Sequence, residues 1–118
     1  TPTIVLKNNE LFFTTGSPGG ARIISAVFQS ILNIVDFNMN LEEATFAKRI
    51  HHQWYPDILE YEFSIDKDIN NDLKKMNYET VSILPLTCLQ TIMFKEGIYY
   101  GYGDFRRVDA LASGEIDD

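Results

Sequence analysis

The segment TTGSPGG at residues 14–20 separates two stretches of contrasting pattern and decides the local fold. Before it, residues 3–7 (TIVLK) and 11–15 (LFFTT) are rich in the β-branched and aromatic residues typical of strands. After it, residues 23–35 carry apolar side chains at helical spacing over about four turns. The pattern therefore predicts two strands joined by a turn at Asn8-Asn9-Glu10, then a glycine-rich break and a long helix.

The predicted long helix has a wide apolar stripe, because Ile23, Ala26 and Ile34 add to the positions that follow the helical period. We therefore expect this helix to be largely buried. The rest of the pattern predicts, in order, a short helix at 41–47 capped by Asn40, an extended segment at 50–63, a helix from Ser64 or Asp66 to about Met76, and strands at 79–84, 89–94 and 98–102. This order predicts an α+β fold with mainly antiparallel strands, helices layered on sheet, and a single domain over residues 1–118.

The composition is that of a globular domain with a packed core. The 118 residues are 45% hydrophobic and 13% aromatic, which argues against disorder. The net charge of −7 argues against nucleic acid as a partner, because a phosphate backbone is bound by clustered lysines and arginines. No apolar run approaches the roughly 20 residues of a membrane span. We expect neither a cofactor nor a metal.

Gly19 and Gly20, directly before the long helix, are the first candidate functional residues. Adjacent glycines let the backbone approach a ligand closely and adopt conformations closed to other residues. Backbone N–H groups at a helix start have no partner within the helix, and the helix dipole favours negative charge there. The segment could bind a phosphate, a carboxylate or an oxyanion. On local sequence alone, a plain strand-to-helix turn is the favoured interpretation.

Several other chemically capable residues favour structural interpretations. His51 and His52 are neighbours on an expected strand, so they point to opposite faces and make a poor zinc site. We expect one of them to turn inward, with Trp54 packed nearby. Asp104 and Arg106 are expected to fix a loop, as a surface pair worth under about 1 kcal/mol.

Thr1 and Cys88 are the residues that could act as nucleophiles. An N-terminal threonine can use its own amine as a base, but Thr1 runs directly into Pro2 and a strand pattern, without supporting residues. Cys88 lies among apolar residues with no acid–base partner nearby in sequence, which favours a position in the core.

Short sequence blocks stand in a characteristic order along the chain. They are PTIVLK at 2–7, TGSPGG at 15–20, RII at 22–24, EA at 43–44, RIHHQWYPD at 49–57, QTIM at 90–93, YG at 100–101 and DFRR at 104–107. This series resembles the small subunit of gamma-glutamyltransferases. The resemblance extends from Pro2 to about Asp109, and TGSPGG together with RIHHQW makes it specific.

The resemblance implies an N-terminal-nucleophile hydrolase, in which one precursor cleaves itself into a large and a small subunit that share an α-β-β-α sandwich. The new N-terminal threonine of the small subunit attacks the gamma-glutamyl amide of glutathione or a related donor. Water, or an amino acid or peptide, then resolves the acyl-enzyme. By the family's pattern, the backbone N–H groups of Gly19 and Gly20 form the oxyanion hole and contact the substrate. This reverses the local preference for a plain turn.

The resemblance also implies what other parts of the protein must supply. The nucleophilic threonine and the groups that hold the glutamyl moiety are expected upstream of residue 1 or in the large subunit, so the chain alone should be inactive. Its partners would be the large subunit and the remainder of the small subunit. The compartment would be periplasmic, secreted or cell-surface. Exposed strand edges and apolar helix faces should make the isolated chain self-associate.

The chain departs from the family's pattern in three places. Ala47-Lys48-Arg49 stands where the family has Ala-Pro-Arg, Thr87-Cys88-Leu89 replaces small residues, and Asp104-Phe105-Arg106 replaces Asp-Pro-Arg. Two alternatives are kept beside the main interpretation. One is a related poly-gamma-glutamate or cephalosporin-acylase-like hydrolase, and the other is a non-catalytic module that binds a small acidic ligand at the helix N-terminus.

Overall fold

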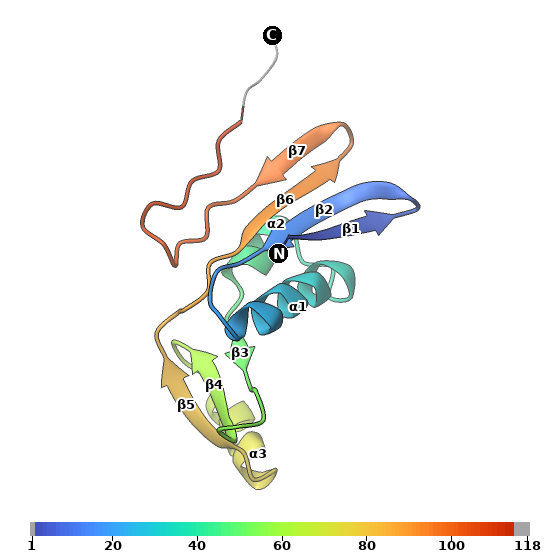
Figure 1. Ribbon diagram of the computed structural model, residues 1–118. Coiled ribbons are helices and arrows are strands. Elements are labelled where there is room, and N and C mark those ends of the chain that lie inside the picture. The colour runs from blue at the N-terminus through green and yellow to red at the C-terminus, as the bar shows by residue number, and fades with distance from the viewer. Residues whose placement is uncertain (1, 115–118) are drawn as a thin grey trace.

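The structure, a computed structural model, describes residues 2–114 and contains two β-sheets connected by helices (Figure 1). The elements are β1 (Thr3–Lys7), β2 (Glu10–Gly16), α1 (Arg22–Val35), α2 (Leu41–Phe46), β3 (Ile50–His51), β4 (Ile58–Glu62), α3 (Lys67–Lys75), β5 (Glu79–Ile83), β6 (Gln90–Lys95) and β7 (Ile98–Gly101). The larger sheet has the order β1-β2-β6-β7 and the smaller sheet the order β3-β4-β5. The α+β class and the order of elements are confirmed, with the extended segment 50–63 divided into β3 and β4.

The larger sheet consists of two hairpins that pair with each other. The turn between β1 and β2 holds Asn8 at φ 55° and Asn9 at φ 65°, the left-handed conformation that asparagine tolerates. The hairpin of β6 and β7 turns at Gly97, where φ is 83°. β2 pairs antiparallel with β6, and the buried hydroxyls of Thr15 and Thr91 form a hydrogen bond of 2.8 Å. This pairing fixes the position from which the glycine-rich loop leaves the sheet.

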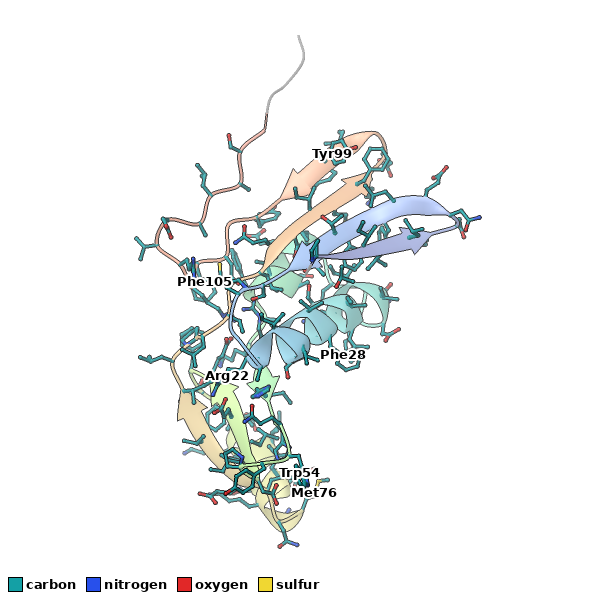
Figure 2. The ribbon with its side chains drawn as sticks, in the orientation of Figure 1. Arg22, Phe28, Trp54, Met76, Tyr99 and Phe105 are labelled. Atoms are coloured by element: carbon teal, nitrogen blue, oxygen red, sulfur yellow. The ribbon has the colours of Figure 1, made fainter. Side chains whose placement is uncertain are left out.

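Helix α1 packs one face on the larger sheet and leaves the other face open (Figure 1). Ala26, Ser30 and Ile34 are its buried residues. The core cluster comprises Phe13, Ile34, Leu41 and Ala44. By contrast, Ile24 is 77% exposed and Phe28, which points away from the sheet in Figure 2, is 58% exposed. The expectation of a largely buried helix therefore holds for the inner face only, because no other described residue covers the outer one.

The smaller sheet contains a parallel pair, β4 with β5, which α3 connects. Asp66 caps α3 by accepting hydrogen bonds from the backbone N–H groups of Asp68 and Ile69. Asn40 caps α2, and Glu43 completes a capping box with it. Both predicted helix starts are thus confirmed. Of the two candidates for the start of α3, Ser64 and Asp66, the structure shows Asp66 as the cap.

The molecule is elongated, with extents of 56 × 33 × 26 Å, and the two sheets lie at different ends (Figure 1). Its radius of gyration is 15.8 Å, whereas a compact domain of this length would have roughly 13.5 Å. Large apolar side chains are exposed at both ends, among them Tyr99 in β7 and Met76 after α3 (Figure 2). Within residues 2–114, none of the helices combines the length and apolarity needed to span a bilayer.

Candidate functional site

The glycine pair lies in the loop between β2 and α1. Gly19 has φ 137° and Gly20 has φ 60°, both outside the range that side-chain-bearing residues favour. Their carbonyl oxygens accept the first hydrogen bonds of the helix, from the N–H groups of Arg22 and Ile23 at 3.2 Å each. Among residues 2–114, neither glycine N–H donates a hydrogen bond, and the N-cap residue Ala21 offers no side-chain acceptor. Two donors at the positive end of α1 can therefore bind an anion or an oxyanion.

Gly19 is also packed tightly against the segment that precedes β6. A Cβ atom at Gly19 would lie 2.7 Å from Cγ2 of Thr87 and 2.9 Å from the carbonyl oxygen of Leu86. A Cβ atom at Gly20 would meet nothing within 4 Å. Backbone conformation therefore favours glycine at both positions, whereas space requires it at Gly19 alone.

Ser17 ties the same loop to the segment before β6. Its Oγ donates to the carbonyl oxygen of Pro18 at 2.7 Å and accepts from the backbone N–H of Cys88 at 3.0 Å. Cys88 is 1% exposed, and burial together with the charge of nearby Asp104 raises the pKa of its thiol. A thiol in this state is a poor nucleophile at neutral pH. The prediction that Cys88 lies in the core is confirmed.

Four charged side chains form a buried network behind this segment. Arg49 Nη2 lies 2.8 Å from Asp104 Oδ2, and Arg106 Nη2 lies 2.7 Å from Glu62 Oε2. Arg106 Nη1 also lies 3.1 Å from Asp104 Oδ1. The four side chains are between 0% and 6% exposed. Asp104 and Arg106 fix a loop as expected, but the expectation of a weak surface pair is wrong, because both lie inside with two further charges.

The network keeps the Asp104 carboxylate ionised. Burial acts to raise the pKa of Asp104, but hydrogen bonds from Arg49 and from the Leu89 backbone N–H outweigh it and hold the pKa below its usual value. Burial lowers the pKa of Arg49, and its hydrogen bond to Asp104 opposes that effect. Sequence reasoning did not place Arg49 and Glu62 beside Asp104 and Arg106, because these partners lie 55 and 44 residues away in the chain.

An ion pair outside the buried network holds the start of α1 to the smaller sheet. Arg22, the first residue of the helix, donates two hydrogen bonds to the Glu60 carboxylate, from Nε and Nη2 at 2.6 Å each. These hydrogen bonds lower the pKa of Glu60 against the opposing effect of burial. Figure 2 shows Arg22 at the junction between α1 and the smaller sheet. The start of α1 is thus held on one side by the ion pair with Glu60. The loop before it is held by the hydrogen bond between Cys88 and Ser17.

The two histidines occupy different environments. His51 is buried with Nδ1 2.7 Å from Ser25 Oγ, whereas Nε2 of His52 lies 2.9 Å from Asp57 Oδ1. The prediction of an inward-turned histidine is confirmed. The expected packing of Trp54 is wrong, because its turn lies at one end of the molecule and leaves the indole 84% exposed (Figure 2). Among the described residues, no group of three or more His, Cys, Asp or Glu side chains is arranged to hold a metal. The remaining candidate, Thr1, lies outside the described residues.

Comparison with known proteins gives matches over almost the whole chain. Residues 1–114 match the family model described as gamma-glutamyltranspeptidase. The chain is 40% identical over 114 residues to the glutathione hydrolase proenzyme of Escherichia coli K12, in a match that covers 96% of this chain and 20% of that protein. The chain thus spans about one fifth of the length of the curated relatives it matches.

Solved structures share the fold. A gamma-glutamyltranspeptidase of Helicobacter pylori has a TM-score of 0.86 and 43% identity, over 91% of this chain and 60% of that chain. A cephalosporin acylase of Bacillus halodurans has a TM-score of 0.80 at 21% identity, over 89% of this chain and 20% of that chain, and shows the fold alone. The expected N-terminal-nucleophile hydrolase fold is confirmed. With a glycine-rich loop at the start of its long helix, a family match from residue 1 to residue 114 and this shared fold, the chain belongs to the gamma-glutamyltranspeptidase family.

Proposed function

We propose that residues 1–118 form one domain, the C-terminal part of the small subunit of a gamma-glutamyltransferase, and that Gly19 and Gly20 supply its oxyanion hole. One observation carries the proposal: the two glycine N–H groups donate no hydrogen bond among the described residues and lie at the N-terminus of α1. Donors of this kind stabilise negative charge that develops on a carbonyl oxygen. The relatives named glutathione hydrolase support glutathione or a similar gamma-glutamyl compound as donor.

The proposed reaction needs a nucleophile from another part of the protein. A threonine hydroxyl adds to the gamma-glutamyl carbonyl carbon, and its proton passes to the α-amine of the same threonine. The carbonyl oxygen becomes an oxyanion, which accepts hydrogen bonds from the glycine pair. Collapse of this intermediate breaks the amide bond: the nitrogen of the leaving group takes the proton held by the threonine α-amine and departs as a neutral amine, while the glutamyl group stays on the threonine as an ester. Water or the amino group of an acceptor then attacks the ester and releases the threonine.

The remainder of the enzyme would be the partner of this chain. Ile24 and Phe28 leave the outer face of α1 apolar and exposed, which supports burial of that face by the large subunit or by the rest of the small subunit. By resemblance to the family, we place the mature enzyme in the periplasm, outside the cell or at the cell surface. The chain by itself would lack activity, because an oxyanion hole without a nucleophile forms no acyl-enzyme.

The proposal is tested by the release of p-nitroaniline from gamma-glutamyl-p-nitroanilide. We expect the full-length protein to be active and the 118-residue chain to be silent. In the full-length protein, Gly19→Ala keeps the backbone N–H, but its Cβ atom would collide with Thr87 and Leu86 and displace that donor. We expect kcat to fall by up to about 10²–10³-fold, the loss that accompanies removal of one oxyanion-hole donor. Self-cleavage is followed separately on gels, so that a processing defect is not mistaken for a catalytic one.

Gly97→Ala is the control for backbone strain. Gly97 also has a positive φ, and a Cβ atom there meets nothing within 4 Å, but it lies in the turn between β6 and β7. We expect this variant to keep the activity of the parent. Turnover by the isolated chain would show that the nucleophile lies within it. A substrate panel that includes poly-gamma-glutamate and a cephalosporin separates the related hydrolase activities.

A further inference from the structure

Thr87 stands between the buried charge network and the glycine pair. It lies in the segment 84–89 that connects β5 to β6, and it is 6% exposed. Its hydroxyl group faces Arg49 and Glu62, and its methyl group faces Gly19. One side chain therefore contacts both features of the site.

The hydroxyl group of Thr87 is held by charged partners. Arg49 Nη1 donates to Thr87 Oγ1 at 3.0 Å, and Thr87 Oγ1 donates to Glu62 Oε1 at 3.5 Å. Arg49 is itself paired with Asp104, and Glu62 with Arg106. The hydrogen bond from Arg49 holds the side-chain rotamer, with the longer contact to Glu62 on the same oxygen, and it thereby sets the position of the methyl group.

The methyl group of Thr87 packs directly against Gly19. It occupies the space where a side chain at Gly19 would lie, since a Cβ atom there would be 2.7 Å from Thr87 Cγ2. The next residue, Cys88, donates its backbone N–H to Ser17 Oγ at 3.0 Å. The loop that carries the glycine pair is therefore held by residues 87 and 88, far along the chain from the loop itself.

We propose that Thr87 is a positioning residue for the oxyanion hole, because it transmits the fixed geometry of the charge network to Gly19. The inference rests on the proposed function of the glycine pair. It gives a role to a position where resemblance to the family leads one to expect a small residue. Without the hydroxyl group, the Thr87 side chain is no longer held in one rotamer. Its methyl group then no longer fixes the direction of the Gly19 N–H. Small misplacement of a donor weakens transition-state stabilisation more than substrate binding.

The first test is Thr87→Val in the full-length enzyme, which keeps the size and branching of the side chain and removes only the hydroxyl group whose hydrogen bonds hold the rotamer. We expect kcat for gamma-glutamyl-p-nitroanilide to fall by about 10-fold and KM to change by less than about twofold. Thr80→Val is the matched control, because Thr80 donates its hydroxyl to Asn70 Oδ1 at 2.8 Å in β5, away from the loop. It should leave both constants unchanged. Equal losses of kcat in the two variants would overturn the inference.

A double-mutant cycle tests the contact between Thr87 and Gly19 directly. It also tests the inference if Thr87→Val fails to fold. Thr87→Ser keeps the hydroxyl group and removes the methyl group, so Gly19→Ala should cost less kcat in the Thr87→Ser background than in the parent. Additive losses would overturn the inference. A parent without gamma-glutamyl activity would instead refute the proposed function. An active parent that Gly19→Ala impairs and Thr87→Val leaves unchanged would refute the role of Thr87 alone.

Discussion

Arg49 and Asp104 are 55 residues apart in sequence and meet in the interior, where Arg49 Nη2 lies 2.8 Å from Asp104 Oδ2. The same carboxylate oxygen accepts the backbone N–H of Leu89 at 2.8 Å. The pair thus fixes the segment just before β6, which includes Thr87 and touches the glycine-rich loop. Removing one member of a buried ion pair leaves the other charge buried without a partner. This costs more folding stability than the intact pair contributes.

Asp104→Asn should therefore destabilise the protein strongly. Loss of the negative charge leaves Arg49 and Arg106 buried with fewer acceptors, at a cost of about 3 kcal/mol or more. Urea-induced unfolding measured by circular dichroism gives the change. Asp72→Asn is the control, because the pair of Asp72 with Lys75 is largely solvent-exposed and its loss should leave the urea midpoint unchanged. Similar midpoints for the two variants would contradict the prediction.

The ionised Asp104 should make stability depend on acid pH. Against the effect of burial, hydrogen bonds from Arg49 and from backbone N–H groups hold the pKa of Asp104 below its usual value, so the unfolded state binds the proton more readily. The stabilisation is complete above the unfolded pKa of about 3.9 and is lost as the pH falls through the lower, folded pKa.

The measurement is the urea midpoint of the parent and of Asp104→Asn between about pH 5 and pH 2. We expect the slope against pH to be shallower in the variant. Glu60, whose pKa is also lowered, mainly by its hydrogen bonds to Arg22, should leave a residual slope in both proteins. Equal slopes would mean that Asp104 does not contribute to acid sensitivity.

The two glycines of the loop should differ in their tolerance to substitution. Gly20 has φ 60° and free space, so Gly20→Ala should cost about 1 kcal/mol from backbone strain, and Gly20→Asn less, because asparagine tolerates this conformation. Gly19→Ala should cost more than either, because Thr87 and Leu86 occupy the space as well. Thermal unfolding of the three variants checks the order. A melting temperature for Gly19→Ala at or above that of Gly20→Ala would contradict it.

The isolated chain should self-associate through the outer face of α1. Ile24 and Phe28 are exposed there, and apolar surface that another part of the enzyme would cover is available for contact between copies. Sedimentation velocity of the 118-residue chain should show concentration-dependent oligomers, and Ile24→Lys/Phe28→Lys should reduce them. Asp68→Lys on α3, a change at a polar position, serves as the control. Oligomers that persist in the double variant would place the contact elsewhere.

The sequence by itself determined the local elements. Asn8 and Asn9 tolerate the left-handed turn between β1 and β2, and Asn40 with Glu43 forms the capping box that starts α2. These features depend on hydrogen bonds and backbone preferences that span at most a few residues, so a single stretch of sequence specifies them. The glycine pair at the start of α1 was visible as a candidate anion site for the same reason.

Only the tertiary structure decided how these elements meet. Three contacts join parts of the chain whose local sequences do not predict that they meet. They are the parallel pairing of β4 with β5, the ion pair of Arg49 with Asp104 and the contact of Thr87 with Gly19. The apolar stripe of α1 predicts more burial than the structure shows. Such a stripe indicates which helix face can be buried, but it does not identify the surface that covers it. Such contacts arise when surfaces distant in sequence pack together, and packing depends on shape and charge in three dimensions.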